Sequence, residues 1–276
     1  MDLVQVAARR KYLSVSGKQM KYSIIILTLL IFCDQCTTKK ITPNDLDQDL
    51  HKHYMKIVAF REDTSLNSWD SLENENKIFR SKMKFYTSMY PFTLNYNFDS
   101  LRFDNIVIVT SDDRLFRIYS WDNMLGGSMR FFENLIQFKS NDNVHSKLYY
   151  NTTNLLEGEY IPYYFKIFTL NSEDKIYYLA INCGIYSGRD ASESIKIFTI
   201  ENNRLNDTVK LIKTTSGFSN KIEVSYNRHV EPQKLINYNS SSQTIYIPIV
   251  LEEGIVSDKF IAYKFNGQYF EKVLSQ

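Results

Sequence analysis

The chain has 276 residues, with 33 Lys and Arg against 31 Asp and Glu, and 14% of its residues are aromatic. Five of the basic residues and one of the acids lie in the first 32 positions, so the rest carries 28 basic and 30 acidic residues. This near-neutral balance excludes electrostatic binding to nucleic acid, which requires clustered Lys and Arg. The 20 Tyr and 18 Phe favour pleated surfaces and therefore predict a β-rich body.

A predominantly apolar stretch of nine residues, 24–32, indicates the cellular compartment in which the protein is expected. A helix of this length rises about 14 Å, roughly half the ~30 Å hydrocarbon core of a bilayer, so it is too short for a stable span. It has the length of the hydrophobic region of a secretory signal, and Lys21 supplies the positive flank. A short buried core helix is the structural alternative.

The run from Met20 to Cys33 resembles a bacterial lipoprotein signal peptide. That class has Leu three residues before the acylated cysteine, which Leu30 matches, whereas Phe32 is bulkier than the small residue usually found there. The resemblance implies a lipid on Cys33, or alternatively on Cys36, and a protein anchored in the bacterial cell envelope, periplasmic or surface-exposed. An ordinary signal peptide with soluble release is the alternative.

Residues 1–19 contain four basic residues and no apolar block, so they fit this signal poorly. The string 8–13 is reminiscent of a twin-arginine signal, but the apolar stretch begins well downstream. A true start at Met20 rather than Met1 is the simpler interpretation. The predicted organisation is an export segment over 1–32, a tether over 33–41, a helical segment over 42–90 and an antiparallel β domain over 91–276.

The helical segment begins with a clear start signal, in which Thr42 is the cap and Pro43 the first helical residue. Apolar residues then recur at three- and four-residue spacing and predict a helix to about Arg61. A second helix is expected from about Ser65 to Met89, with acids in its early turns and bases in its later turns, as the helix dipole prefers. Pro91 ends it.

Strand-like runs begin near Asn105, where a hairpin with an Asp112–Asp113 turn is expected. Polar turn clusters separate the later runs, which indicates an antiparallel meander. The further predicted strands are 130–138, 147–150, 163–170, 175–183, 194–200, 221–226, 244–251, 259–265 and 269–273. The predicted fold is thus mainly β, of the α+β class: a helical hairpin followed by a sandwich-like or curled sheet.

A weak internal repeat supports an alternative fold. Similar strand pairs begin near residues 105, 175 and 244, about 70 residues apart. Propeller blades would explain this spacing, but a dozen strands at four per blade make only about three blades, below the usual minimum of four. Recurrent hairpins explain the same repeat and are the favoured interpretation.

The most distinctive local strings are 111–114, 119–122 and 126–130, which are similar to runs in uncharacterised β-rich lipoproteins of the Bacteroidetes type. This resemblance covers most of the β region and implies no known activity. Functionally, Asp112, Trp121 and Asp122 beside a glycine loop suggest a platform for a sugar or peptide, with Arg130 as a polar clamp. Structurally, Asp112 belongs to a hairpin turn and Trp121 is an aromatic residue of the core or its rim, and this is the favoured interpretation.

Catalytic and metal signals are weak. His51 and His53 are two apart on a predicted helix and point to different sides, and no loop has calcium-binding spacing, so no metal or other cofactor is expected. No nucleophile elbow is present, and Cys183 follows an apolar run, where a lone thiol is usually a small buried hydrophobe.

The sequence therefore predicts a lipid-anchored envelope protein that acts as a non-enzymatic binding or assembly module, with a glycan or a protein as partner. The alternative is a secreted glycan-active hydrolase that uses paired carboxylates near Trp121. Two such carboxylates stand about 5 to 9 Å apart in glycosidases, which makes the alternative testable by geometry.

Overall fold

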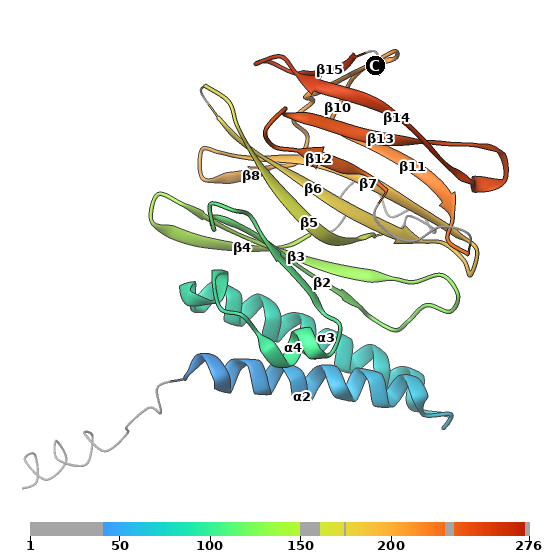
Figure 1. Cartoon of the computed structure of the whole chain (residues 1–276). Helices are drawn as coiled ribbons and strands as arrows, with labels where there is room; N and C mark the ends of the chain where they lie inside the picture. The colour runs from blue at the N-terminus through green and yellow to red at the C-terminus, as the bar shows by residue number, and fades with distance from the viewer. Residues whose placement is uncertain (1–40, 150–160, 174, 230–234, 274–276) are drawn as a thin grey trace, which may run out of the picture. The chain divides into compact units, whose positions relative to one another are not determined.

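The computed structural model describes residues 41–149, 161–173, 175–229 and 235–273. The chain from Pro43 onward forms one compact unit. Strands make up 45% and helices 25%, which confirms the mainly β class (Figure 1). Within the described residues, no helix combines the length and the apolar character that crossing a bilayer requires. Residues 1–40, including Cys33 and Cys36, lie outside the described part.

Two long antiparallel helices, α2 (Pro43–Glu62) and α3 (Ser68–Met89), form one layer of the unit. Their bounds agree with the expected ones to within three residues, because Pro43 starts the first helix and Pro91 follows the second. The expected β region opens with two further short helices, η1 (Pro91–Leu94) and α4 (Asp99–Phe103), so strands begin only at Val107.

Sheet A lies next to the helices and is an antiparallel meander in the order β1-β2-β3-β4. Its strands are β1 (Val107–Thr110), β2 (Phe116–Asp122), β3 (Phe132–Ser140) and β4 (Asn143–Tyr149). The β1–β2 hairpin turns through Asp112 and Asp113, as expected: the Ser111 N–H bonds the Phe116 carbonyl at 2.8 Å and closes the turn.

Sheet B is the central sheet, in the order β11-β7-β6-β5, with β8 paired to β7. Its strands are β5 (Tyr163–Asn171), β6 (Ile176–Ile185), β7 (Asp190–Glu201), β8 (Arg204–Asn206) and β11 (Lys221–Asn227). Two of the ladders, β6 with β7 and β7 with β11, set residues of the three strands side by side: Asn182, Ser194 and Glu223 lie in one row.

Sheet C is six-stranded, in the order β10-β9-β15-β14-β13-β12. Its elements are β9 (Ile212–Thr214), β10 (Gly217–Ser219), β12 (Asn237–Asn239), β13 (Thr244–Val250), η2 (Glu252–Gly254), β14 (Val256–Phe265) and β15 (Phe270–Val273). The expected antiparallel meander holds for β12 to β15, but β15 pairs in parallel with β9 at Phe270 and Ile212.

Three hydrophobic cores join these layers. Successive side chains of a strand point to opposite faces of its sheet, so neighbouring residues pack into different cores. On β2, Tyr119 packs with the helices and Ile118 packs with sheet B; on β6, Tyr178 packs with sheet A and Leu179 with sheet C. Sheets A and B are thus each covered on both faces. The unit is a stack of helices, sheet A, sheet B and sheet C (Figure 1).

The three copies of the internal repeat fall one in each sheet, as the pairs β1–β2, β6–β7 and β13–β14. Each pair is an antiparallel neighbour in its own sheet, so the repeat marks recurrent hairpins. The sandwich-like expectation is extended by a third sheet, and the strands do not close into a barrel.

Candidate functional site

On the face of sheet B that points toward sheet A, the side chains change from large and aromatic to small or polar along the strands. Tyr178 and Phe198 contribute to the core between the two sheets, but the next inward positions on β6 and β7 are small or polar. These positions are Ala180, Asn182 and Gly184 on β6, and Lys196, Ser194 and Ser192 on β7. Because large apolar side chains are missing there, the two sheets do not fill the space between them.

The resulting cavity, here called the inter-sheet pocket, has a volume of about 290 Å³. Sheet A contributes Asn134 and Tyr149, the two residues before β5 contribute Ile161 and Pro162, and β5 itself contributes Tyr164. Sheet B and its flanks supply the other side: Asn182, Gly184, Tyr186, Ser192, Ser194, Lys196, Asn220, Lys221 and Glu223. The size is at the lower end of the range for ligand sites and suits a ligand of one sugar ring or a few atoms more.

Neutral amide and hydroxyl groups line the buried part of the pocket. Asn182 is 4% exposed, and its Oδ1 accepts a hydrogen bond of 2.7 Å from the Ser194 hydroxyl. On the opposite side, Asn134 accepts from Ser120 and donates to the Pro162 carbonyl at 2.8 Å. These bonds fix the two amides in orientation, which is what a preformed polar site requires.

An aromatic ring covers the bare backbone of Gly184. A Cβ at this position would lie 3.1 Å from Cε1 of Tyr186, which is a tight contact, so glycine gives the ring room to approach the backbone closely. The Tyr186 hydroxyl shares a hydrogen bond of 2.5 Å with Ser192, which holds the ring in place. The pocket therefore contains a positioned aromatic side chain beside its polar groups.

Two residues of the pocket lining, Lys196 and Tyr149, form a charged cluster with Asp207. Lys196 donates to the Tyr149 hydroxyl, which donates to Asp207 Oδ2 at 2.7 Å, and Lys196 Nζ lies 3.4 Å from the same oxygen. Burial lowers the pKa of Lys196, although Asp207 opposes the shift. Burial also raises the pKa of Tyr149 and of Tyr164, so both hydroxyls are protonated at neutral pH, and the proton of Tyr149 is engaged by Asp207.

The charges at the rim are balanced in the same way. Lys221 Nζ lies 3.0 Å from Glu223 Oε2, and both side chains are exposed. Each lysine of the pocket thus has an acidic partner, Lys196 with Asp207 and Lys221 with Glu223. This pairing favours a neutral polar ligand over a strongly charged one.

The residues singled out in the sequence do not form one site. Trp121 is 1% exposed and packs in the core between helices and sheet A, with Phe79 5.4 Å away edge-on. It is not a surface platform, which agrees with the structural interpretation of this residue. Asp122 and Arg130 do come together, with Arg130 Nη1 3.2 Å from Asp122 Oδ2.

Asp112 is separate from this pair. It is exposed in the β1–β2 turn, whereas Asp122 ends β2. The seven residues of β2 follow the turn that contains Asp112 and end at Asp122. The two carboxylates therefore stand roughly 20 Å apart along the strand direction. Asp122 Oδ1 also accepts the Met124 N–H at 2.8 Å, which gives this carboxylate a turn-forming role. Asp112 and Asp122 therefore do not make the carboxylate pair that hydrolysis needs.

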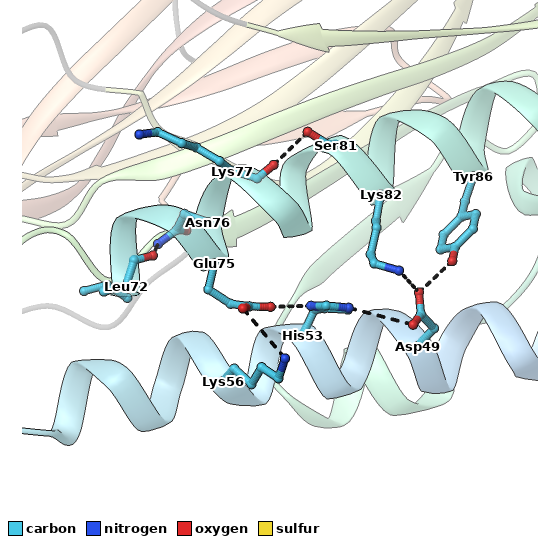
Figure 2. Close-up of polar contacts among 10 residues, drawn as sticks. All are labelled: Asp49, His53, Lys56, Leu72, Glu75, Asn76, Lys77, Ser81, Lys82 and Tyr86. Atoms are coloured by element: carbon cyan, nitrogen blue, oxygen red, sulfur yellow. Dashed lines mark hydrogen bonds and ion pairs between the residues drawn. The ribbon is translucent and has the colours of Figure 1, made fainter. Parts of the chain in front are cut away.

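A second polar cluster joins α2 to α3 (Figure 2). Asp49 Oδ2 accepts from Lys82 at 2.7 Å and from Tyr86 at 2.6 Å, and His53 lies between Asp49 and Glu75. Burial works against the Asp49 carboxylate, but these hydrogen bonds outweigh it and lower its pKa. The donors and acceptors satisfy one another, so the cluster holds the helix pair together.

The two helix histidines point to different partners, as expected from their spacing. His51 Nδ1 lies 2.6 Å from Asp104, whereas His53 contacts Glu75. Among the described residues, no group of three or more His, Cys, Asp or Glu side chains is placed to hold a metal ion. Cys183 is a free, buried thiol, as the sequence indicates, and burial raises its pKa.

The pocket residues were not singled out in the sequence. Their signal is alternation: small or polar residues stand at every second position of two strands whose other face is largely apolar, as in Asn182 and Gly184 or Ser192 and Ser194. Comparison with family models, curated proteins and solved structures gives no significant match to this chain. The geometry of the pocket therefore carries the functional argument.

Proposed function

We propose that this protein is a lipid-anchored binding module of the bacterial cell envelope, and that its inter-sheet pocket takes one sugar unit of a glycan. The observation that carries the proposal is the pocket itself. Buried amides and hydroxyls that are fixed in orientation line a cavity of about 290 Å³ between two sheets.

The chemistry of the lining supports a neutral, polyhydroxylated ligand. Asn134, Asn182 and Ser194 offer donors and acceptors without net charge, and the lysines at the pocket are paired with acids. Tyr186 adds a ring beside them. Sugars present both hydroxyls and an apolar face of C–H groups, so they match a pocket of mixed polar and aromatic lining.

Binding is favoured over hydrolysis. The carboxylates nearest to the pocket, Asp207 and Glu223, are each engaged by a lysine. Asp112 lies in the turn before β2, whereas Asp122 is the last residue of that strand. A pair of acids that flanks a common space, as glycosidases need, is not found among the residues that the structure describes at this pocket.

The ligand proposal is tested by a glycan array, followed by calorimetric titration of the sugars that bind. The Asn182→Ala/Ser194→Ala variant removes two of the fixed groups and should weaken binding by at least about tenfold, since a hydrogen bond contributes ~1 kcal/mol net. Ser257→Ala on sheet C is the matched control and should bind like the wild type. Equal affinity in all three proteins would refute the pocket as the site.

The anchor proposal is tested separately. Mass spectrometry of the membrane-extracted protein should find acyl chains on Cys33. Cys33→Ser should release the protein or trap its precursor, whereas Cys36→Ser should leave acylation unchanged. An unmodified soluble product from the wild-type gene would contradict the anchor, and loss of acylation only in Cys36→Ser would move it to that residue.

A further inference from the structure

A group of large apolar side chains is exposed where α3 ends and η1 begins. Phe85 is 52% exposed, Met89 59% and Phe92 37%. Phe85 and Met89 are four residues apart on α3 and share one helix face, and Phe92 follows in η1. These three residues, together with the half-buried Tyr90 between them, are here called the aromatic end.

The aromatic end is a continuous, firmly held surface. Ring centroids are 5.6 Å apart for Phe85 and Tyr86, 6.3 Å for Tyr86 and Tyr90, and 5.7 Å for Tyr90 and Phe92. The Tyr86 hydroxyl is fixed by its 2.6 Å hydrogen bond to Asp49 of α2 (Figure 2). Exposed aromatic groups that are held in place in this way are typical of an interaction surface rather than of a mobile end.

The position of this surface in the unit indicates what it contacts. Asp49 bonds both Lys82 and Tyr86, so the first half of α2 lies beside the last turns of α3. The aromatic end and the first residue of α2, Pro43, are therefore at the same end of the helix layer (Figure 1). Phe103, the most exposed phenylalanine of the described residues at 86%, ends α4, which bonds the same half of α2 through Asp47.

The number of residues between Cys33 and α2 limits how far the start of α2 can lie from a lipid attached to Cys33. Ten residue steps separate Cys33 from Pro43. A fully extended chain spans at most about 36 Å over that length, so a lipid on Cys33 keeps the start of α2 within this distance of the bilayer. Lys39 and Lys40 lie on the connecting stretch and suit anionic headgroups.

We propose that the aromatic end is a membrane-contact surface that lies in the headgroup region of the bilayer to which the protein is tethered. Phe, Tyr and Met side chains partition favourably into this region, and a lipid chain combined with a second weak contact gives stable attachment. The proposal rests on the proposed lipid anchor. It orients the unit with its helices toward the membrane.

The first test uses the chain from Ile41 onward, which contains every residue of the three cores and no acylation site. It should sediment with vesicles of phosphatidylethanolamine and phosphatidylglycerol. Phe85→Ser/Met89→Ser/Phe92→Ser should weaken this association by at least about tenfold, because each change removes apolar area from the contact. The matched control is Phe218→Ser, which removes a phenylalanine 46% exposed on sheet C and should sediment like the wild type. Thermal melting confirms that each variant folds.

A second test reads the orientation directly. Phe92→Trp should be quenched by brominated lipids. Trp69 is 51% exposed near the start of α3, roughly 24 Å from Phe85 along the helix, and should not be quenched in the wild type. Equal quenching of both positions, or no sedimentation of the wild-type chain, would overturn the proposal.

Two other outcomes are distinguishable from these. A dimer that the triple variant dissolves, without vesicle binding, would assign the aromatic end to a second copy of the chain and would overturn the membrane contact. Vesicle binding by the chain from Ile41 together with an unacylated Cys33 in cells would refute the anchor while supporting the membrane contact.

Discussion

The two faces of sheet B are made by alternate residues of the same strands, but one face packs in an apolar core and the other lines a cavity. Toward sheet C, β6 and β7 present Ile181 and Ile195, which are fully covered in an apolar core. Toward sheet A, the neighbouring residues Asn182 and Ser194 line the inter-sheet pocket. Strands with a two-residue side-chain period can therefore contribute to a core on one face and to a pocket on the other, because each face is specified by its own set of positions.

Polar groups also occur on the apolar face, but they are used differently. Glu193 is 1% exposed, and its Oε2 accepts the N–H groups of Leu235 and Ile236 at 2.8 and 3.0 Å. It fixes the chain that leads into sheet C. On the pocket face, the Asn182 amide adjoins the cavity, and among the described residues its side-chain partner is Ser194. The polar group on the sheet C face thus holds a neighbouring chain segment in place, whereas the polar group on the sheet A face borders the cavity.

The largest difference between the faces should appear in stability. Ile195→Ala removes a fully buried side chain and should lower the free energy of unfolding by about 3 to 4 kcal/mol. Ser194→Ala, the adjacent position on the pocket face, should cost only about 1 kcal/mol, because it removes one hydrogen bond, to Asn182 beside the cavity, and little packed volume. Urea unfolding of the two variants measures both. Equal losses would show that the pocket is as tightly packed as the core.

A smaller contrast is expected between the polar residues Glu193 and Ser192. Glu193→Ala leaves two backbone N–H groups without their acceptor and should cost about 2 to 3 kcal/mol. Glu193→Gln keeps an acceptor oxygen and should recover most of this loss. Ser192→Ala on the pocket face should cost about 1 kcal/mol or less. The same unfolding assay compares the three, and a Gln variant as unstable as the Ala variant would assign the effect to charge rather than to the hydrogen bonds.

Elements with strong local signals were predictable from the sequence. Pro43 and Pro91 bound the two long helices, and Asn266–Gly267 forms the expected turn, with Gly267 at a φ of 99° that favours glycine. The strands β8, β9, β10 and β12 were not predicted, because three residues are too few to show a period. The division into three sheets depends on pairings between distant segments, such as Phe270 with Ile212, which no local pattern encodes.

The candidate site was harder to predict than the fold. Trp121 and the neighbouring acids attract attention because their side chains are rare or reactive, but Trp121 is a core residue and Asp122 stabilises a turn. Asn182 and Ser194 are common residue types, and only their positions beside Ile181 and Ile195, on the alternate face of each strand, mark them. Their juxtaposition with Asn134 arises from the stacking of two sheets, which the sequence pattern does not determine.

The smallest expected effect is the pH dependence of stability that Asp207 causes. Asp207 contacts Tyr149, a residue of the core between sheets A and B, and Lys196 of the pocket lining. Burial works against the charge of Asp207, but the hydrogen bond from Tyr149 and the attraction of Lys196 outweigh it and lower its pKa from the ordinary 3.8. A carboxyl group with a lowered pKa in the folded state stabilises the protein above its unfolded pKa, and this stability is lost as the pH falls through the folded value.

Asp207→Asn should therefore cost about 1 kcal/mol at neutral pH, since it replaces charge-assisted hydrogen bonds by neutral ones. The difference from the wild type should shrink below about pH 4, as Asp207 becomes protonated in the unfolded and then in the folded protein. Unfolding curves from pH 7 to the acid limb measure this, with Asp258→Asn at an exposed position of sheet C as the control. A pH-independent difference would show that Asp207 stabilises the protein through packing rather than through its charge.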